Sequence, residues 1–245
     1  SQSKLVVHKV DSANQANGLK DAKFSLHWFN PTTSSWETTA MQHFTSDTAG
    51  KFTIYVGDKD LEAKADTLYK LVEEEAPDGY RKTSKTFYFI FPSEGETDTD
   101  AYAKALGGKT VDADGNALPL QADSSLMICI FNEQSDLYIP NERSQLIIRK
   151  FWTNQYNEAT APKETAVTVK LYKYAKDGTN GTRNNGIFVQ TITLDNTNNW
   201  TFTYNSVEEG YLYYIEEAST GGKYEVTYSD SNTTGVENGG LLTLT

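Results

Sequence analysis

Two charged residues in the first half of the sequence share a strand face with apolar side chains. Lys9 ends the alternating run Leu5–Lys9, and Glu73 ends the run Tyr69–Glu73. Side chains two residues apart in a strand point to the same face. Both charges are therefore expected inside a core, where an unpaired charge is costly.

The second half of the sequence repeats this arrangement. Lys150 ends the run Leu146–Lys150, and Glu217 ends the run Tyr213–Glu217. The lysine precedes the glutamate by nearly the same number of residues in both halves, which indicates an internal repeat. In the first half a further run of the same parity, which starts at Ile128, closes on Asn132.

Three interpretations fit a buried lysine and glutamate. The lysine can lie at a strand end and extend its ammonium to water, or the two groups can form a buried ion pair. The third is a reaction. Burial favours the neutral amine of Lys9, which can attack the carboxamide of Asn132, while a protonated Glu73 polarises that carbonyl and transfers protons as ammonia leaves. The product is a Lys–Asn amide that forms once, without turnover.

The elements expected around these residues are strands. Alternating apolar runs recur along the chain, separated by turn sequences such as Asn17-Gly18 and Pro77-Asp78-Gly79. One helix is expected at Asp98–Leu106, with Thr97 or Asp98 as N-cap and Gly107-Gly108 as the stop. Short strands with closely spaced turns predict an all-β sandwich.

Composition excludes several classes of function. The 245 residues carry 22 Lys and Arg against 33 Asp and Glu, a net charge of −11, which disfavours binding to nucleic acid or to an anionic membrane. No apolar run is long enough for a membrane-spanning helix. Cys129 is the only cysteine and there are three histidines, so we expect no disulfide and no metal site. No cofactor motif occurs, and a turnover enzyme is disfavoured.

Two domains are expected. The polar connector Asn132–Ser144 separates two apolar strands, and we place the boundary within it, which gives domains at 1–139 and 140–245. The first domain carries an acidic, partly helical insertion at 92–125. The simpler interpretation of this insertion is a solvated surface excursion, and the alternative is a binding loop.

The sequence Tyr69–Tyr80 (YKLVEEEAPDGY) resembles the E-box of Cna-B-type domains in Gram-positive pilins and surface adhesins. Leu5–Asp11 resembles the opening strand of that family, and Asp47–Phe52 a turn that follows it. In the second half, Leu146–Trp152 and Asn199–Phe202 are similar to the same family. The E-box is a specific signal in the first half, and its counterpart in the second half is looser.

The resemblance implies two tandem immunoglobulin-like β-sandwiches with internal Lys–Asn isopeptide bonds. Carried over by position, it assigns Lys9 and Asn132 as the cross-linked pair and Glu73 as the catalytic residue. In the second domain it assigns Lys150 and Glu217, and the acceptor asparagine is expected just beyond Thr245. No metal or cofactor is implied.

The same resemblance implies a structural subunit of a pilus or of another wall-anchored protein, secreted and displayed on the cell surface. Its expected partners are other pilin subunits joined by sortase. A minor pilin, basal or accessory, is favoured because no pilin-lysine element of the YPKN type is found. The alternative is an adhesin module that binds a host-cell or matrix ligand through the insertion or an aromatic patch.

Overall fold

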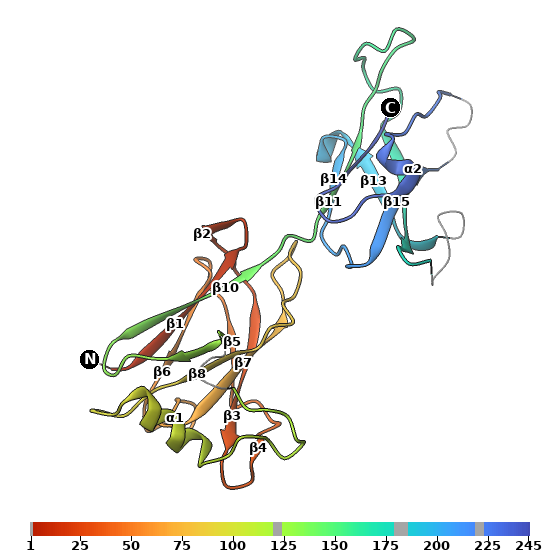
Figure 1. Cartoon of the computed structure of the whole chain (residues 1–245). Helices are drawn as coiled ribbons and strands as arrows, with labels where there is room; N and C mark the ends of the chain where they lie inside the picture. Colours follow the sequence, from red (N-terminus) through yellow and green to blue (C-terminus); the bar gives the residue numbers. More distant parts are fainter. Residues whose placement is uncertain (1, 120–123, 179–185, 219–222) are drawn as a thin grey trace. The chain divides into compact units, whose positions relative to one another are not determined.

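Strands make up most of the regular structure of the described chain, and they belong to two units (Figure 1). The structure is a computed structural model that describes residues 2–119, 124–178, 186–218 and 223–245. Unit 1 contains residues 1–77 and 82–142, and unit 2 contains residues 78–81 and 143–245. The expected boundary after residue 139 thus falls inside the last strand of unit 1.

Unit 1 is a sandwich of two sheets. In the first sheet, β1 pairs in parallel with β10 and antiparallel with β2 and β6. The second sheet runs β4-β3-β7-β8-β9, with β5 also paired to β3. The strands of the first sheet are β1 (Lys4–Asp11), β2 (Asn14–Gly18), β6 (Lys51–Tyr55) and β10 (Gln134–Asn141). Those of the second are β3 (Lys23–Asn30), β4 (Ser35–Trp36), β5 (Gln42–Thr45), β7 (Leu68–Glu75), β8 (Phe87–Ile90) and β9 (Leu126–Ile128).

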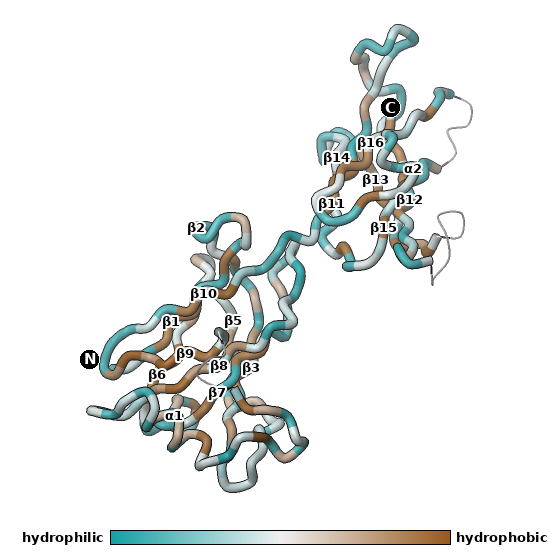
Figure 2. Tube along the Cα trace, in the orientation of Figure 1, coloured by the Kyte–Doolittle hydropathy of each residue, from teal (hydrophilic) through white to brown (hydrophobic). Residues whose placement is uncertain are grey.

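The core of unit 1 lies between these sheets. It contains the inward side chains of both, such as Leu5 and Val7 from β1 and Phe24 and Leu71 from the opposite sheet, each fully buried. Figure 2 shows the hydrophobic colour concentrated on the strands of each unit. The sequence expectation of an all-β sandwich is confirmed by this arrangement.

The insertion contains the expected helix, α1 (Asp98–Leu106). Thr97 caps its first turn, because its side chain accepts a hydrogen bond from the backbone N–H of Asp100, and Gly107 ends it in the left-handed conformation. The helix connects β8 to β9, which run parallel and therefore need a crossover. Residues 120–123 of the insertion lie outside the described residues.

The helix is part of the fold rather than a solvated excursion. Its buried residues Ala101, Ala105 and Leu106 pack against Phe29 and Leu68 on the outer face of the second sheet. The acidic composition of the segment predicts a solvated surface excursion, but its apolar residues recur at helical spacing and bury one face of the helix.

Unit 2 is a smaller sandwich of two three-stranded sheets. One runs β14-β11-β16, with β11 and β16 parallel, and the other runs β13-β12-β15. The strands are β11 (Leu146–Lys150), β12 (Ala166–Ala175), β13 (Ile187–Asp195), β14 (Thr201–Tyr204), β15 (Tyr211–Glu217) and β16 (Leu241–Leu244). The 3₁₀ turn η2 (Asn196–Asn198) precedes β14, and the short helix α2 (Ser231–Thr234) lies beside β15 and β16.

Both units contain a tyrosine whose hydroxyl accepts a hydrogen bond from an upstream backbone N–H. The hydroxyl of Tyr69, near the start of β7, accepts a hydrogen bond from the backbone N–H of Lys64 at 2.7 Å. The hydroxyl of Tyr213, near the start of β15, accepts one from the backbone N–H of Glu208 at 2.9 Å. In each case the donor lies five residues upstream of the tyrosine, so the internal repeat extends to local structure.

Candidate cross-linking site

Lys9 lies near the end of β1 and points into the core of unit 1. Its side chain is fully buried, and its amine Nζ donates a hydrogen bond to the carbonyl oxygen of Ile139 at 2.5 Å. Ile139 is directly opposite Lys9 in the parallel pairing of β1 with β10. The first and last strands of unit 1 therefore meet at this lysine.

Glu73 reaches the same point from β7 in the facing sheet. Its Oε1 lies 3.8 Å from Lys9 Nζ, and its side chain is also fully buried. Its Oε2 accepts two hydrogen bonds, from the backbone N–H of Thr83 at 2.7 Å and from Nδ2 of Asn141 at 3.0 Å. The two carboxyl oxygens thus have different neighbours, the amine on one side and the carboxamide on the other.

The asparagine at this cluster is Asn141, the last residue of β10, which is only 1 % exposed. Asn132, the acceptor expected from the sequence, lies in the exposed turn before β10 with φ of +59°. Its backbone N–H donates to the hydroxyl of Ser3 at 2.6 Å. At about 3.3 Å per strand residue, β10 holds the two asparagines more than about 20 Å apart.

The structure therefore brings Lys9 and Glu73 together but does not bring Asn132 to them. The run from Ile128 to Asn132 is not one strand, because β9 ends at Ile128 and a turn follows. Strand β10 lies within the polar segment that the sequence predicts to be a connector, because the outward residues of this strand are polar. Its inward residues Leu137, Ile139 and Asn141 repeat the pattern of Leu5–Lys9, and this signal could have identified Asn141 as the asparagine that faces the core.

Burial shifts the pKa of Lys9 and that of Glu73 toward the neutral form of each group. Burial lowers the pKa of Lys9 from 10.5 to about 8, although the charge of Glu73 raises it in part. Burial raises the pKa of Glu73, opposed by its hydrogen bonds from Asn141 and Thr83 and by the charge of Lys9. At pH 7 a group with a pKa of 8 is about one-tenth neutral, so a nucleophilic amine is available next to a carboxyl group that can carry a proton.

Unit 2 contains a second buried pair, as the sequence predicted. Lys150 Nζ on β11 lies 3.5 Å from Glu217 Oε2 on β15, and the two side chains are 1 % and 2 % exposed. The neighbours differ from those in unit 1. The amine faces the rings of Trp152 and Tyr224, at 4.7 Å and 4.9 Å from their centroids, and the Tyr224 hydroxyl donates to Glu217 Oε1 at 2.6 Å.

The strand register gives the position in unit 2 that corresponds to Asn141. Lys150 is opposite Leu244 as Lys9 is opposite Ile139, and Asn141 lies two residues after Ile139. By this register, none of the described residues of unit 2 occupies the position that corresponds to Asn141. Asn232 is buried in unit 2 but has another role, because its carboxamide bonds the backbone N–H and carbonyl of Ile215.

Other candidates from the sequence do not form sites. Cys129 is buried, and burial raises the pKa of its thiol to about 12. Within the ranges that the structure describes, no group of three His, Cys, Asp or Glu side chains could hold a metal ion. No helix in those ranges is long and apolar enough to cross a membrane.

The fold and the two buried clusters define a class of protein: tandem β-sandwiches, each with a lysine and a glutamate that form an ion pair in its core. Family models match both sandwiches. Residues 3–104 match the SpaA family, a prealbumin-like fold domain, and residues 146–239 match the Cna protein B-type domain. Each unit therefore contains a segment that matches one of these two domain families. The first match ends within α1, before Asn141.

Several solved structures are similar to the chain. The shaft pilin spaA from Lactobacillus rhamnosus GG is 14% identical with a TM-score of 0.44, over 100% of this chain and 97% of that one. The Streptococcal ancillary pilin is 13% identical with a TM-score of 0.36, over 89% and 54%. The Bacillus anthracis TIE protein is 15% identical with a TM-score of 0.34, and this chain spans 32% of it. No curated protein matches the chain.

Proposed function

We propose that the chain is a structural subunit of a Gram-positive surface fibre, in which unit 1 is closed by a self-formed amide between Lys9 and Asn141. The observation that carries this proposal is the buried cluster of Lys9, Glu73 and Asn141. It joins the first and last strands of the unit to the opposite sheet. In this proposal Asn141 takes the place of Asn132 as the acceptor. Lys9 and Glu73 keep the roles that the sequence assigned to them.

The proposed reaction uses both oxygens of the Glu73 carboxyl group, because one lies beside the amine of Lys9 and the other beside the carboxamide of Asn141. Oε1, next to the amine, accepts the proton that Lys9 Nζ loses as it attacks the carboxamide carbon of Asn141. The carboxyl group then transfers a proton to the Asn141 nitrogen, and the C–N bond breaks to release ammonia. The hydrogen bond from Lys9 Nζ to the Ile139 carbonyl holds the amine beside β10 before the attack.

A bond at this place has a mechanical consequence. Tension applied at the two ends of unit 1 acts first on β1 and β10, which lie side by side. With Lys9 and Asn141 joined, the load passes directly from one strand to the other, and the 131 residues between them cannot extend. This property suits a subunit of a fibre that is pulled along its length.

Single-molecule pulling of the chain from its two ends tests this proposal. We expect that unit 1 of the unchanged protein releases no length, whereas Asn141→Ala releases roughly 450 Å, at about 3.5 Å per residue. Unit 2 provides an internal reference in both proteins. Release of the same length from unit 1 in the unchanged protein and in the variant would contradict the proposal.

Placement in the fibre and in the cell is part of the same proposal. We infer that the chain is displayed outside the cell as a minor, basal or accessory subunit joined to other pilins by sortase. The support is the family assignment and the absence of a pilin-lysine element in the sequence. Detection of the chain in high-mass wall polymers, at lower copy number than the shaft subunit and only in sortase-positive cells, tests this placement.

An adhesive role is a second candidate because an exposed phenylalanine on β13 of unit 2 lies against a tyrosine pair that is half-buried to buried. Tyr172 stacks on Tyr214 with ring centroids 5.2 Å apart and contacts Phe188, which is 53 % exposed. Binding of the chain to immobilised matrix proteins, compared with Phe188→Ser, tests this role. Deletion of the insertion is a poor test, because α1 contributes to the core of unit 1.

A further inference from the structure

Residues 78–81, which follow Glu73 in the sequence, belong to unit 2, although the chain on both sides of them belongs to unit 1. Unit 1 then ends at residue 142, one residue beyond Asn141. The segment that leads away from Glu73 and the segment that leads away from Asn141 therefore both enter unit 2.

Inside unit 2 these two segments are joined to each other through their backbones. The backbone N–H of Ser144 donates to the carbonyl oxygen of Gly79 at 2.7 Å. Next to this bond, Tyr80 and Arg143 form an antiparallel β-bridge. Ser144 is buried, and its hydroxyl donates to the carbonyl oxygen of Val207, which ties the pairing to the rest of unit 2. We call these four paired residues the clamp.

The loop from Glu73 to Thr83, which carries one half of the clamp, is closed at its base inside unit 1. The backbone N–H of Thr83 donates to Glu73 Oε2 at 2.7 Å, and the carboxamide of Asn141 donates to the same oxygen at 3.0 Å. Gly79 lies in the middle of this loop, and Ser144 lies three residues after Asn141. The clamp thus fixes the loop that holds Glu73 to the chain segment that carries the acceptor.

We propose that the clamp positions Asn141 for attack by Lys9, with Gly79 and Ser144 as the positioning residues. This inference rests on the amide proposed above for unit 1. An amine and a carboxamide carbon react only from a near-attack geometry, and a displacement of about 1 Å can slow such a reaction about a hundredfold. The clamp limits this displacement because it restrains both segments at once. Amide formation in unit 1 therefore depends on the folding of unit 2.

The backbone conformation of Gly79 suits it to the clamp. Its φ is +82°, in the left-handed region that β-branched residues avoid and that asparagine tolerates. A Cβ atom at this position would lie 2.5 Å from Nε2 of Gln145, at the end of a flexible side chain. Gly79→Val and Gly79→Asn therefore displace the same carboxamide. They differ in whether the carbonyl of residue 79 keeps its direction towards Ser144.

The test follows amide formation in the full chain during cell-free synthesis, with samples quenched in denaturant and the loss of about 17 Da read from the intact mass. We expect Gly79→Val to slow this loss at least about tenfold, and Gly79→Asn to keep at least about half of the unchanged rate. Ser144→Pro removes the N–H that bonds Gly79, and the same slowing is expected. Ser144→Ala is the matched control, because it keeps this N–H and loses only the bond to Val207, and its rate is expected to stay within about twofold of the unchanged chain.

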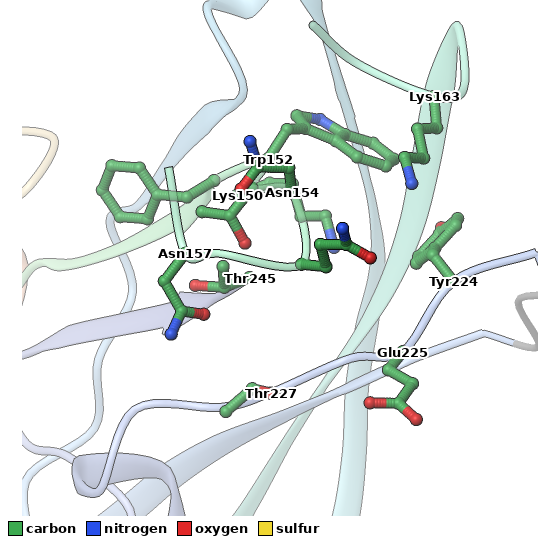
Figure 3. A pocket seen from close by; sticks show the side chains of 12 residues that line it. Lys150, Trp152, Asn154, Asn157, Lys163, Tyr224, Glu225, Thr227 and Thr245 are labelled. Carbon is green, nitrogen blue, oxygen red and sulfur yellow. The ribbon is translucent and has the colours of Figure 1, made fainter. Parts of the chain in front are cut away.

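A fold control comes from a part of unit 2 that is separate from the clamp. A pocket of about 500 Å³ beside Lys150 is lined by Trp152, Asn157 and Tyr224 among others, and none of the four clamp residues lines it (Figure 3). The indole N–H resonance of Trp152 in an NMR spectrum therefore reports whether unit 2 keeps its fold in each variant. Slow amide formation in a variant that keeps this resonance is the signature of positioning, because loss of the fold would remove both.

The two pairs of variants act on opposite sides of one hydrogen bond, so the result does not depend on a single substitution. Equal rates in Gly79→Val and Gly79→Asn, or equal rates in Ser144→Pro and Ser144→Ala, would overturn the proposal. Absence of ammonia loss in the unchanged chain would show that the amide itself does not form, and the clamp would then have no reaction to position. The two failures are distinguishable, because the first leaves the loss of ammonia in place and the second removes it.

Discussion

Replacement of Asn141 by Ala is expected to lower the stability of unit 1 by about 5 kcal/mol. The Lys9–Asn141 bond would close a loop of 133 residues, both ends included, and the entropy that such a closure removes from the unfolded chain corresponds to about 5 kcal/mol at 25 °C. Small domains are stable by only about 5 to 15 kcal/mol in total. The variant therefore loses a large fraction of the stability of the unit.

Scanning calorimetry of the whole chain measures this change. At a few degrees per kcal/mol, the unit 1 transition is expected to fall by about 15 °C in Asn141→Ala, while the unit 2 transition stays in place. Glu73→Ala leaves Asn141 in place but removes the proton carrier, so we expect a fall of similar size.

Asn132→Gly is the matched control, because glycine accepts the positive φ of that turn and the change removes the other candidate acceptor. Its unit 1 transition is expected to stay within about 2 °C of the unchanged protein. The reasoning is refuted if Asn141→Ala unfolds at the temperature of the unchanged protein, or if Asn132→Gly shows the large fall instead.

Further predictions concern charge, the thiol and the helix. In Asn141→Ala, we expect Lys9 to have a pKa of about 8 in the folded chain and of 10.5 in the unfolded chain. Between these two pH values the unfolded chain binds one proton more than the folded chain. The free energy of unfolding therefore rises with pH, by up to about 3 kcal/mol. Urea titrations at pH 7.5 and 10.5 measure this rise, and Lys9→Met in the same background should abolish it. Cys129 is expected to react with iodoacetamide at pH 8 at least about a hundredfold more slowly in the folded chain than in urea, since burial raises the pKa of its thiol to about 12; equal rates would contradict this. Thr97→Ala is expected to cost about 1 kcal/mol, because the Thr97 side chain caps α1, and an unchanged unit 1 transition would show that α1 is not coupled to the core.

Much of the fold could be predicted because strand periodicity and capping are local signals. The helix at Asp98–Leu106 and its caps are as the sequence predicted, since Thr97 and Gly107 each satisfy a backbone requirement at one end. The packing of α1 on the outer face of the β3-β7-β8 sheet could not be predicted, because it depends on the parallel crossover from β8 to β9.

The site was predicted in part for a similar reason. Lys9 and Glu73 break the alternation of strands that are otherwise apolar inside, and the core between the sheets brings them together. Asn141 lies in a strand at the sheet edge with a polar outer face, and proline at position 140 makes that strand look like a connector. Its role depends on the parallel pairing of β10 with β1, which joins residues far apart in the sequence.

The central claim is the bond between Lys9 and Asn141, and mass spectrometry of the purified, denatured chain tests it most directly. We predict an intact mass lower than that of the sequence by about 17 Da, the mass of one ammonia, and a branched proteolytic peptide that contains both Lys9 and Asn141. Both signals should be absent in Glu73→Ala. An unmodified mass in the unchanged protein, or a branched peptide that joins Lys9 to Asn132, would contradict the account.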